Sequence, residues 1–289
     1  MQDHTASAGN PGYFVTMGEQ ETERLLALHQ CYQQLHTHAL ESQAAPLVGK
    51  TSGEQILDVA CGTGGWALDV ARWQPASKVI GIDLSPSLLA AATAQAAELG
   101  LKNVGFQVMD VREPFTFPDQ TFTLVHARAL QYVMRADRWP TFVMECHRVL
   151  QSAGVLCLTE GENVITTMPI FEHLSSLHIE ASRRAGYSFS PAGSCTGVTA
   201  MLATLLRKAG LREVQSQVFA IDGSAGTEAH ANFVQYFRLL FPLVLPFLLT
   251  WGVVRQEEGE RLIQQACEEL KAEDFCGIWY FRTAWGQKA

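Results

Sequence analysis

The residues with the clearest chemical potential form a glycine-rich loop, Asp58-Val59-Ala60-Cys61-Gly62-Thr63-Gly64-Gly65. The loop follows a short apolar run and precedes a helical pattern, so its glycines let a ligand approach the backbone and the helix N-terminus presents free N–H groups. Gly62, Gly64 and Ala67 also fit the GxGxxG/A fingerprint of dinucleotide binding, and Asp83 lies 21 residues after Gly62. A nicotinamide oxidoreductase is therefore one function that this loop allows.

Two carboxylates favour a ligand other than a pyrophosphate. Asp58 stands at the mouth of the loop, where a buried carboxylate would repel phosphates but would suit the ammonium group of a methionine moiety. Asp110 ends the third expected strand, where it can accept a hydrogen bond from the exocyclic amine of adenine. Asp58 could instead only cap the loop. Asp83 could be the N-cap of the next helix, although Ser85 suits that task better.

Short apolar runs alternate with helical patterns around these residues. Strands are expected over 56–60, 78–83, 105–109, 122–126 and 155–160, and helices over 66–73, 87–99 and 136–150. After residue 161 the alternation stops, with helices expected over 170–185, 199–209 and most of 228–270, and strands over 213–221 and 277–285. The alternating part predicts a parallel sheet with helices on both faces.

Four motifs in this order, DVACGTGG, GIDLS, VMDV and RVLQSAGVLCLTE, resemble class I S-adenosylmethionine-dependent methyltransferases of the UbiE-like group. The resemblance covers about residues 13–160, and the C-terminal AWGQK is similar to the AWGRK ending of many small-molecule methyltransferases. It implies an α/β, Rossmann-like doubly wound sheet of seven strands, the last one antiparallel, with helical cap insertions.

The pattern and the resemblance together divide the chain into four parts. These are a disordered N-terminus (1–12), an N-terminal helical cap (13–54), a Rossmann core that binds S-adenosylmethionine (55–162), and cap helices with the C-terminal strands that complete the sheet (163–289). Tyr13 and the helix that contains Arg24 and His29 resemble an N-terminal segment that closes over the cofactor.

The resemblance implies S-adenosyl-L-methionine as cofactor and S-adenosyl-L-homocysteine as product. Asp58 would orient the methionine end, and Asp83 would accept both ribose hydroxyls. Arg128 could pair with the methionine carboxylate or form a surface ion pair. The residues expected to bind the cofactor are Tyr13, Asp58, Ala60, Gly62, Thr63, Gly64, Asp83, Leu84, Met109, Asp110, Val111, Ala127 and Arg128.

Methyl transfer is an in-line displacement at a sulfonium, so the enzyme chiefly positions two reactants. A base is needed only if the acceptor must lose a proton. His126 and Glu160 are the expected catalytic candidates because they end the fourth and fifth strands, which face the crevice of an open α/β sheet. His173 and His178 are further candidates that also fit a solvated helix face. No His, Cys and carboxylate cluster has metal-ligand spacing, so no metal is expected.

The acceptor site is expected in the C-terminal half. Residues 233–251 are apolar nearly all round, and Pro242 and Pro246 interrupt them. The apolar run 239–254 is shorter than the ~20 residues that span a bilayer, so a buried or site-lining helix is expected. The prolines would kink it and open a pocket, shared with 170–177, for a ring-bearing or long-chain molecule. The expected substrate residues are His29, His173, Phe237, Phe241 and Phe247; a dimer interface or plain core is the alternative.

The amino-acid composition limits the classes of substrate and partner that are expected. The net charge of −8 argues against a nucleic-acid substrate. Seven cysteines without CxxC spacing and an N-terminus without an apolar leader predict a cytoplasmic protein, and a homodimer is allowed. The expected function is methyl transfer to O, N or C of a small apolar metabolite, such as one of secondary metabolism. A cyclase or pericyclase that binds the same cofactor, and a non-enzymatic binder of apolar ligands, are the alternatives.

Overall fold

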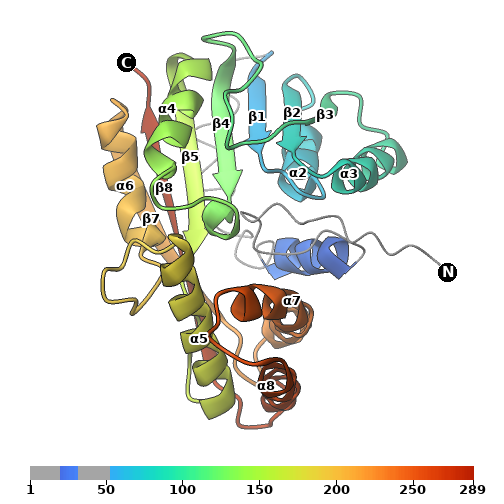
Figure 1. The fold of residues 1–289 in the computed structure, drawn as a ribbon. Coiled ribbons are helices and arrows are strands. Elements are labelled where there is room, and N and C mark those ends of the chain that lie inside the picture. The colour runs from blue at the N-terminus through green and yellow to red at the C-terminus, as the bar shows by residue number, and fades with distance from the viewer. Residues whose placement is uncertain (1–19, 32–52) are drawn as a thin grey trace, which may run out of the picture.

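The computed structural model describes residues 20–31 and 53–289, which build an eight-stranded sheet with helices on both faces (Figure 1). The strands are β1 (Gln55–Val59), β2 (Lys78–Asp83), β3 (Val104–Val108), β4 (Phe122–Arg128), β5 (Leu150–Gly161), β6 (Ile165–Thr166), β7 (Arg212–Asp222) and β8 (Gly277–Gln287). The helices are one over residues 20–31, α2 (Gly65–Trp73), α3 (Pro86–Glu98), the short 3-10 turn η1 (Leu130–Tyr132), α4 (Trp139–Val149), α5 (Pro169–Ala185), α6 (Val198–Lys208), α7 (His230–Thr250) and α8 (Gln256–Glu269).

The strand order is β3-β2-β1-β4-β5-β8, and β6 and β7 also pair with β8. Strands β1 to β5 are parallel, whereas β8 is antiparallel to β5. The predicted doubly wound sheet with an antiparallel last strand is therefore confirmed. The two-residue strand β6 was not predicted, because so short a run carries no periodicity.

Alternate residues of β1 explain why the sheet is covered on both faces. Leu57 and Val59 lie in a core cluster with side chains of α4 and α6, whereas Ile56 packs with side chains of α2. Asp58 points to the same face as Ile56, because successive strand residues face opposite sides. The glycine loop then joins β1 directly to α2, which places Asp58 beneath the helix N-terminus.

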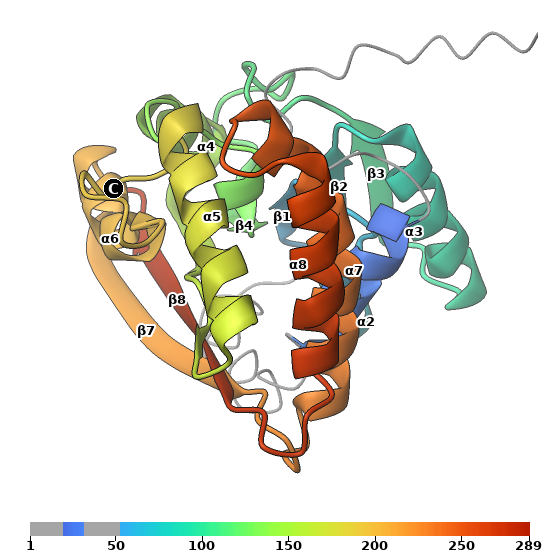
Figure 2. The ribbon, with the colours of Figure 1, turned by 60° about the horizontal axis from the view of Figure 1, so that its bottom comes forward.

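A third core cluster lies beyond the carboxyl ends of the parallel strands. It joins the helix 20–31 to α5, α7 and α8 (Figures 1 and 2). The buried ion pair of Arg24 with Glu21, at 2.7 Å, fixes this packing, because Nη1 of Arg24 also donates to the Tyr236 hydroxyl of α7 at 3.2 Å. The helix 20–31 is thereby held against the cap.

Helix α7 runs without interruption through both prolines. Arg238, Pro242, Pro246 and Thr250 are exposed and lie four residues apart, on one edge of the helix. The carbonyls that lose their i+4 partner there can be hydrated. The opposite edge carries the buried residues. α7 is long and apolar enough to cross a membrane, but half of its most apolar window is buried inside the protein.

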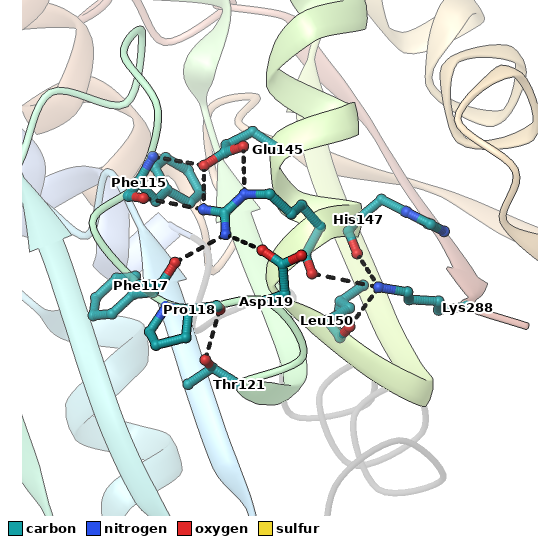
Figure 3. A network of polar contacts seen from close by, with 10 residues as sticks. Phe115, Phe117, Pro118, Asp119, Thr121, Glu145, His147, Leu150 and Lys288 are labelled. Atoms are coloured by element: carbon teal, nitrogen blue, oxygen red, sulfur yellow. Dashed lines mark hydrogen bonds and ion pairs between the residues drawn. The ribbon is translucent and has the colours of Figure 1, made fainter.

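The motif RVLQSAG and the C-terminal AWGQK meet at the edge where β5 begins (Figure 3). Nζ of Lys288 donates to the carbonyls of His147 and Leu150 at 2.8 and 2.7 Å, where a cation suits the C-terminus of α4. The Arg148 guanidinium bonds Glu145, Asp119 and two carbonyls of the loop before β4. These motif residues therefore stabilise the sheet, at the end remote from the glycine loop.

Candidate functional site

The glycine loop has a backbone that only small residues allow. Gly62 and Gly64 have φ of 57° and 76°, in the left-handed region. A Cβ on Gly64 would lie 2.9 Å from the Ala92 Cβ and from the Phe106 ring, so both strain and space require glycine. Cys61 N–H bonds the Ile82 carbonyl at 2.9 Å, which holds the loop against β2.

Asp83, at the end of β2, braces this loop. Its Oδ2 accepts the N–H of Gly62 and its Oδ1 that of Ser85, both at 2.9 Å. Burial raises the pKa of Asp83, and these backbone hydrogen bonds oppose that rise. Ser85 caps α3 through the N–H of Leu88, at 3.4 Å, so the N-cap role falls to Ser85. Each Asp83 oxygen keeps a second lone pair for a diol.

A cavity lies between the ends of β2 and β3. Its walls are Ala60, Asp83, Leu84, Asp110, Val111, Arg112 and Val133. The Asp110 carboxylate binds Nε and Nη2 of Arg112, at 2.9 and 2.6 Å, and this pairing lowers the pKa of Asp110. Sequence reasoning missed Arg112; its place two residues after Asp110 was the available signal. Asp110 keeps lone pairs for an adenine amine, but it shares them with this guanidinium.

A second cavity lies beside the glycine loop. Its walls are Leu25, Leu28, His29, Asp58, Ala60, Cys61, Gly62, Thr63, Gly65, Trp66, His126, Arg128 and Ala129. Asp58 and His126 are register partners on β1 and β4, and Nδ1 of His126 lies 2.8 Å from Oδ1 of Asp58. Trp66 stacks on the imidazole, with ring centroids 3.8 Å apart. Burial lowers the pKa of His126, although Asp58 opposes this.

His29 and Arg128 close the same cavity from two elements. Nε2 of His29 lies 3.3 Å from the Asp69 carboxylate, and Nδ1 lies 3.4 Å from Nη2 of Arg128. His29 thereby bridges the carboxylate of α2 and the guanidinium at the end of β4. His29, an expected substrate residue, is thus placed by the glycine loop. Arg128 lines this cavity rather than the molecular surface.

Glu160 is fully buried at the carboxyl half of β5. Its two oxygens accept the N–H groups of Leu130 and Gln131, at 2.7 and 3.2 Å. Burial raises its pKa to about 8. Glu160 therefore holds the backbone of the segment that begins at the last residue of β4, residues 128–133.

A third cavity lies under the cap helices. Its walls are Gln131, Tyr132, Glu162, Asn163, Val164, Phe171, Leu174, Ser175, His178, Thr196, Phe237, Leu240, Phe241, Val244 and Trp279. The expected Phe237 and Phe241 are among them, together with part of 170–177. The α7 residues that line it lie opposite Pro242 and Pro246, so the prolines do not open it.

The remaining expected residues fall in different places. Phe247 packs against the ring of His178, with centroids 6.5 Å apart. His173 is exposed on α5, which matches the solvated face that the sequence allowed. Met109 N–H bonds the Asp83 carbonyl at 2.9 Å, and Ala127 is buried in the sheet core. Tyr13 lies outside the described residues.

Segment 128–133 connects the three cavities. Arg128 and Ala129 line the cavity beside the glycine loop, and Val133 lines the cavity between the ends of β2 and β3. Gln131 and Tyr132 line the cavity under the cap helices, which we call the apolar cavity. The segment therefore forms a wall common to a polar two-part site and an apolar site.

Comparisons with known proteins agree with this geometry. Residues 56–154 match the methyltransferase domain family. The chain is 32% identical over 136 residues to a demethylmenaquinone methyltransferase of Lactococcus lactis, covering 46% of this chain and 51% of that protein. It is 34% identical over 140 residues to a sterol 24-C-methyltransferase of Eremothecium gossypii, covering 46% and 35%. The chain thus spans about half the length, or less, of these curated relatives.

A solved structure shows the same fold. It is phosphoethanolamine N-methyltransferase 2 of Haemonchus contortus, in complex with phosphomonomethylethanolamine and S-adenosylhomocysteine, with a TM-score of 0.56, 18% identity, and 94% of this chain and 58% of that chain covered. The match of residues 56–154 to the methyltransferase domain family, with the glycine loop and the strand-end carboxylates, supports a class I S-adenosylmethionine-dependent methyltransferase.

Proposed function

We propose that this protein transfers the methyl group of S-adenosylmethionine to O, N or C of a small, largely apolar molecule. The observation that carries the proposal is the common wall formed by residues 128–133, because it brings a polar two-part cavity next to an apolar one. The curated relatives are named for demethylmenaquinone and for a sterol, which also supports a small-molecule acceptor.

The residues of the polar cavities fit the cofactor. Asp83 would hold the ribose hydroxyls, and Leu84 and Val111 would contact the adenine ring. Asp58 would face the ammonium group of the methionine moiety and Arg128 its carboxylate. When bound, the cofactor supplies an electrophilic methyl group on its sulfonium.

His126 and Glu160 are the expected catalytic candidates, and their contacts support positioning roles. His126 would fix the carboxylate of Asp58 through Nδ1, stacked on Trp66. Glu160 would fix the common wall through the N–H groups of Leu130 and Gln131. Catalysis would then rest on the proximity of two positioned reactants.

The setting of the reaction follows from composition. With a net charge of −8 we propose that no nucleic acid takes part, and that the protein acts in the cytoplasm. α7 would serve as a cap helix rather than as a membrane span, because its Phe237 edge packs in the core. A homodimer is compatible with this arrangement.

Calorimetry tests the proposal directly. S-adenosylhomocysteine should bind the full chain and NAD should not. Binding of NAD alone would overturn the proposal in favour of an oxidoreductase. Mass spectrometry of acceptor candidates after incubation with S-adenosylmethionine should show the gain of one methyl group; a rearranged product of unchanged mass would indicate a cyclase instead.

A further inference from the structure

The apolar cavity has an aromatic wall. Phe171 and Phe237 have ring centroids 5.0 Å apart, and Phe237 and Trp279 5.2 Å apart. Phe241 packs edge-on against Phe171, at 5.1 Å. Such a wall offers flat, polarisable surfaces on which another ring can stack or pack edge-to-face.

The carboxylate of this cavity already has partners. Oε2 of Glu162 accepts the Thr196 hydroxyl at 2.6 Å and its N–H at 3.1 Å, and Oε1 accepts the Thr199 hydroxyl at 2.8 Å. Nε1 of Trp279 donates to the Glu162 carbonyl at 2.7 Å. Glu162 thus holds the loop before α6, and its negative charge at the cavity wall disfavours an anionic ligand.

The imidazole of this cavity carries no charge near neutral pH. Burial lowers the pKa of His178 to about 4. The rings of Tyr132 and Phe247 lie beside it, with centroids 6.4 and 6.5 Å away. No Lys or Arg side chain is among the described residues that line the cavity, so an anionic ligand would find no counter-charge there.

One residue that lines the cavity has a side-chain oxygen that accepts no hydrogen bond from the described residues. Oδ1 of Asn163 is buried and has no hydrogen-bond partner among the described residues. Asn163 directly follows Glu162 and lines the cavity with it. A buried amide oxygen without a partner is unfavourable, and a donor group on a bound ligand would satisfy it.

We propose that the apolar cavity binds a ring-bearing molecule without a negative charge, which donates a hydrogen bond from a hydroxyl or N–H group to Oδ1 of Asn163. The proposal rests on the proposed function in one respect, because this molecule would be the methyl acceptor. The aromatic side chains select the ring, the Glu162 carboxylate without a Lys or Arg among the described lining residues disfavours a negative charge, and Asn163 sets the orientation of the ligand.

Three biphenyl probes test the proposal by calorimetry, with the full chain saturated by S-adenosylhomocysteine. They are 4-phenylphenol, its methyl ether 4-methoxybiphenyl, and biphenyl-4-carboxylate. The phenol should bind at least about tenfold more tightly than the ether or the carboxylate. Equal affinity for phenol and ether, tighter binding of the carboxylate, or no binding of any probe would each overturn the inference.

Two variants locate the selectivity. Asn163→Leu, which removes the acceptor oxygen, should weaken binding of the phenol about tenfold and leave the affinity for the ether within threefold. Gln235→Leu, at an exposed position of α7 that is not among the cavity walls, is the matched control and should keep the preference for phenol. An unchanged phenol-to-ether ratio in folded Asn163→Leu overturns the role of Asn163. If S-adenosylhomocysteine itself does not bind, the proposed function fails; if it binds and the phenol preference is absent, only this inference fails.

Discussion

Asp58 and His126 lie side by side on neighbouring strands, with Nδ1 of His126 2.8 Å from Oδ1 of Asp58 and Trp66 stacked on the imidazole. Both side chains are almost fully buried at the wall of the cavity beside the glycine loop. A carboxylate with one oxygen fixed in this way presents its other oxygen in a defined direction. The pair is therefore arranged to orient Asp58 toward a ligand.

This pair predicts different effects for two substitutions of His126. His126→Phe keeps a ring against Trp66 but removes the donor to Asp58, and it should weaken S-adenosylhomocysteine binding about tenfold, since a hydrogen bond to a charged group contributes roughly 1.5–3 kcal/mol. His126→Asn keeps an N–H donor and should weaken S-adenosylhomocysteine binding by less than about threefold. Calorimetry on both folded variants distinguishes them; a larger loss of affinity in His126→Asn than in His126→Phe would mean that the ring stacked on Trp66, not the hydrogen bond, is what matters.

Asp83 is expected to contribute strongly to cofactor affinity. Asp83→Asn leaves one of the N–H groups of Gly62 and Ser85 without its acceptor and weakens any bond to a ribose diol. The dissociation constant of S-adenosylhomocysteine should rise at least about tenfold. The exposed Asp137→Asn is the matched control and should leave it unchanged. A folded Asp83→Asn protein with wild-type affinity would exclude the role.

The aromatic side chains of α7 should separate acceptor binding from cofactor binding. Phe237 and Phe241 line the apolar cavity, so Phe237→Leu and Phe241→Leu should weaken binding of 4-phenylphenol about tenfold while S-adenosylhomocysteine affinity stays within about threefold. Phe247→Leu should weaken binding of 4-phenylphenol less, because Phe247 is not a cavity wall and contacts the wall residue His178.

Phe233 supplies the control for the α7 series. It is fully buried and is not among the cavity walls. Phe233→Leu should lower the melting temperature, because a large-to-small change in a core costs about 1–3 kcal/mol, without changing probe affinity. If all four variants only lose stability and none alters probe binding, the cavity is plain core.

His178 predicts a pH dependence of stability. Its pKa is about 4 in the folded protein against 6.5 in the unfolded chain, so the unfolded state binds a proton first as pH falls. The contribution of His178 to stability is complete above pH 6.5 and is lost as pH falls from 6.5 to 4. The lost stability should be on the order of 1–3 kcal/mol.

The matched variant for this pH prediction is His178→Phe, which has no titrating group. Chemical denaturation of wild type and variant between pH 7.5 and 4.5 should show the wild type losing stability relative to the variant on the acid side. A constant difference across this range would contradict a buried neutral imidazole.

The sequence by itself determined the core of the fold and the strand-end positions of the glycine loop, Asp83 and Asp110. The glycine loop, Asp83 and Asp110 are local signals, because each follows a strand whose apolar run is readable and whose carboxyl end must face the crevice. In the structure, most ends of strands β1 to β5 lie within a few residues of the expected bounds. The exception is β5, which begins earlier than expected, at Leu150.

Only the tertiary structure decided which side chains meet. Asp58 and His126 are 68 residues apart, and the register of β1 against β4 alone makes them neighbours. Glu160 turned out to bind the backbone after β4, a partner that no spacing reveals. The sequence also left open which edge of α7 is buried, because periodicity cannot assign a buried face to a helix that is apolar nearly all round. The packing of α5, α8 and the helix 20–31 buried its Phe237 edge and left the prolines outside, since contact with neighbouring elements, not sequence pattern, sets which apolar residues lose their water.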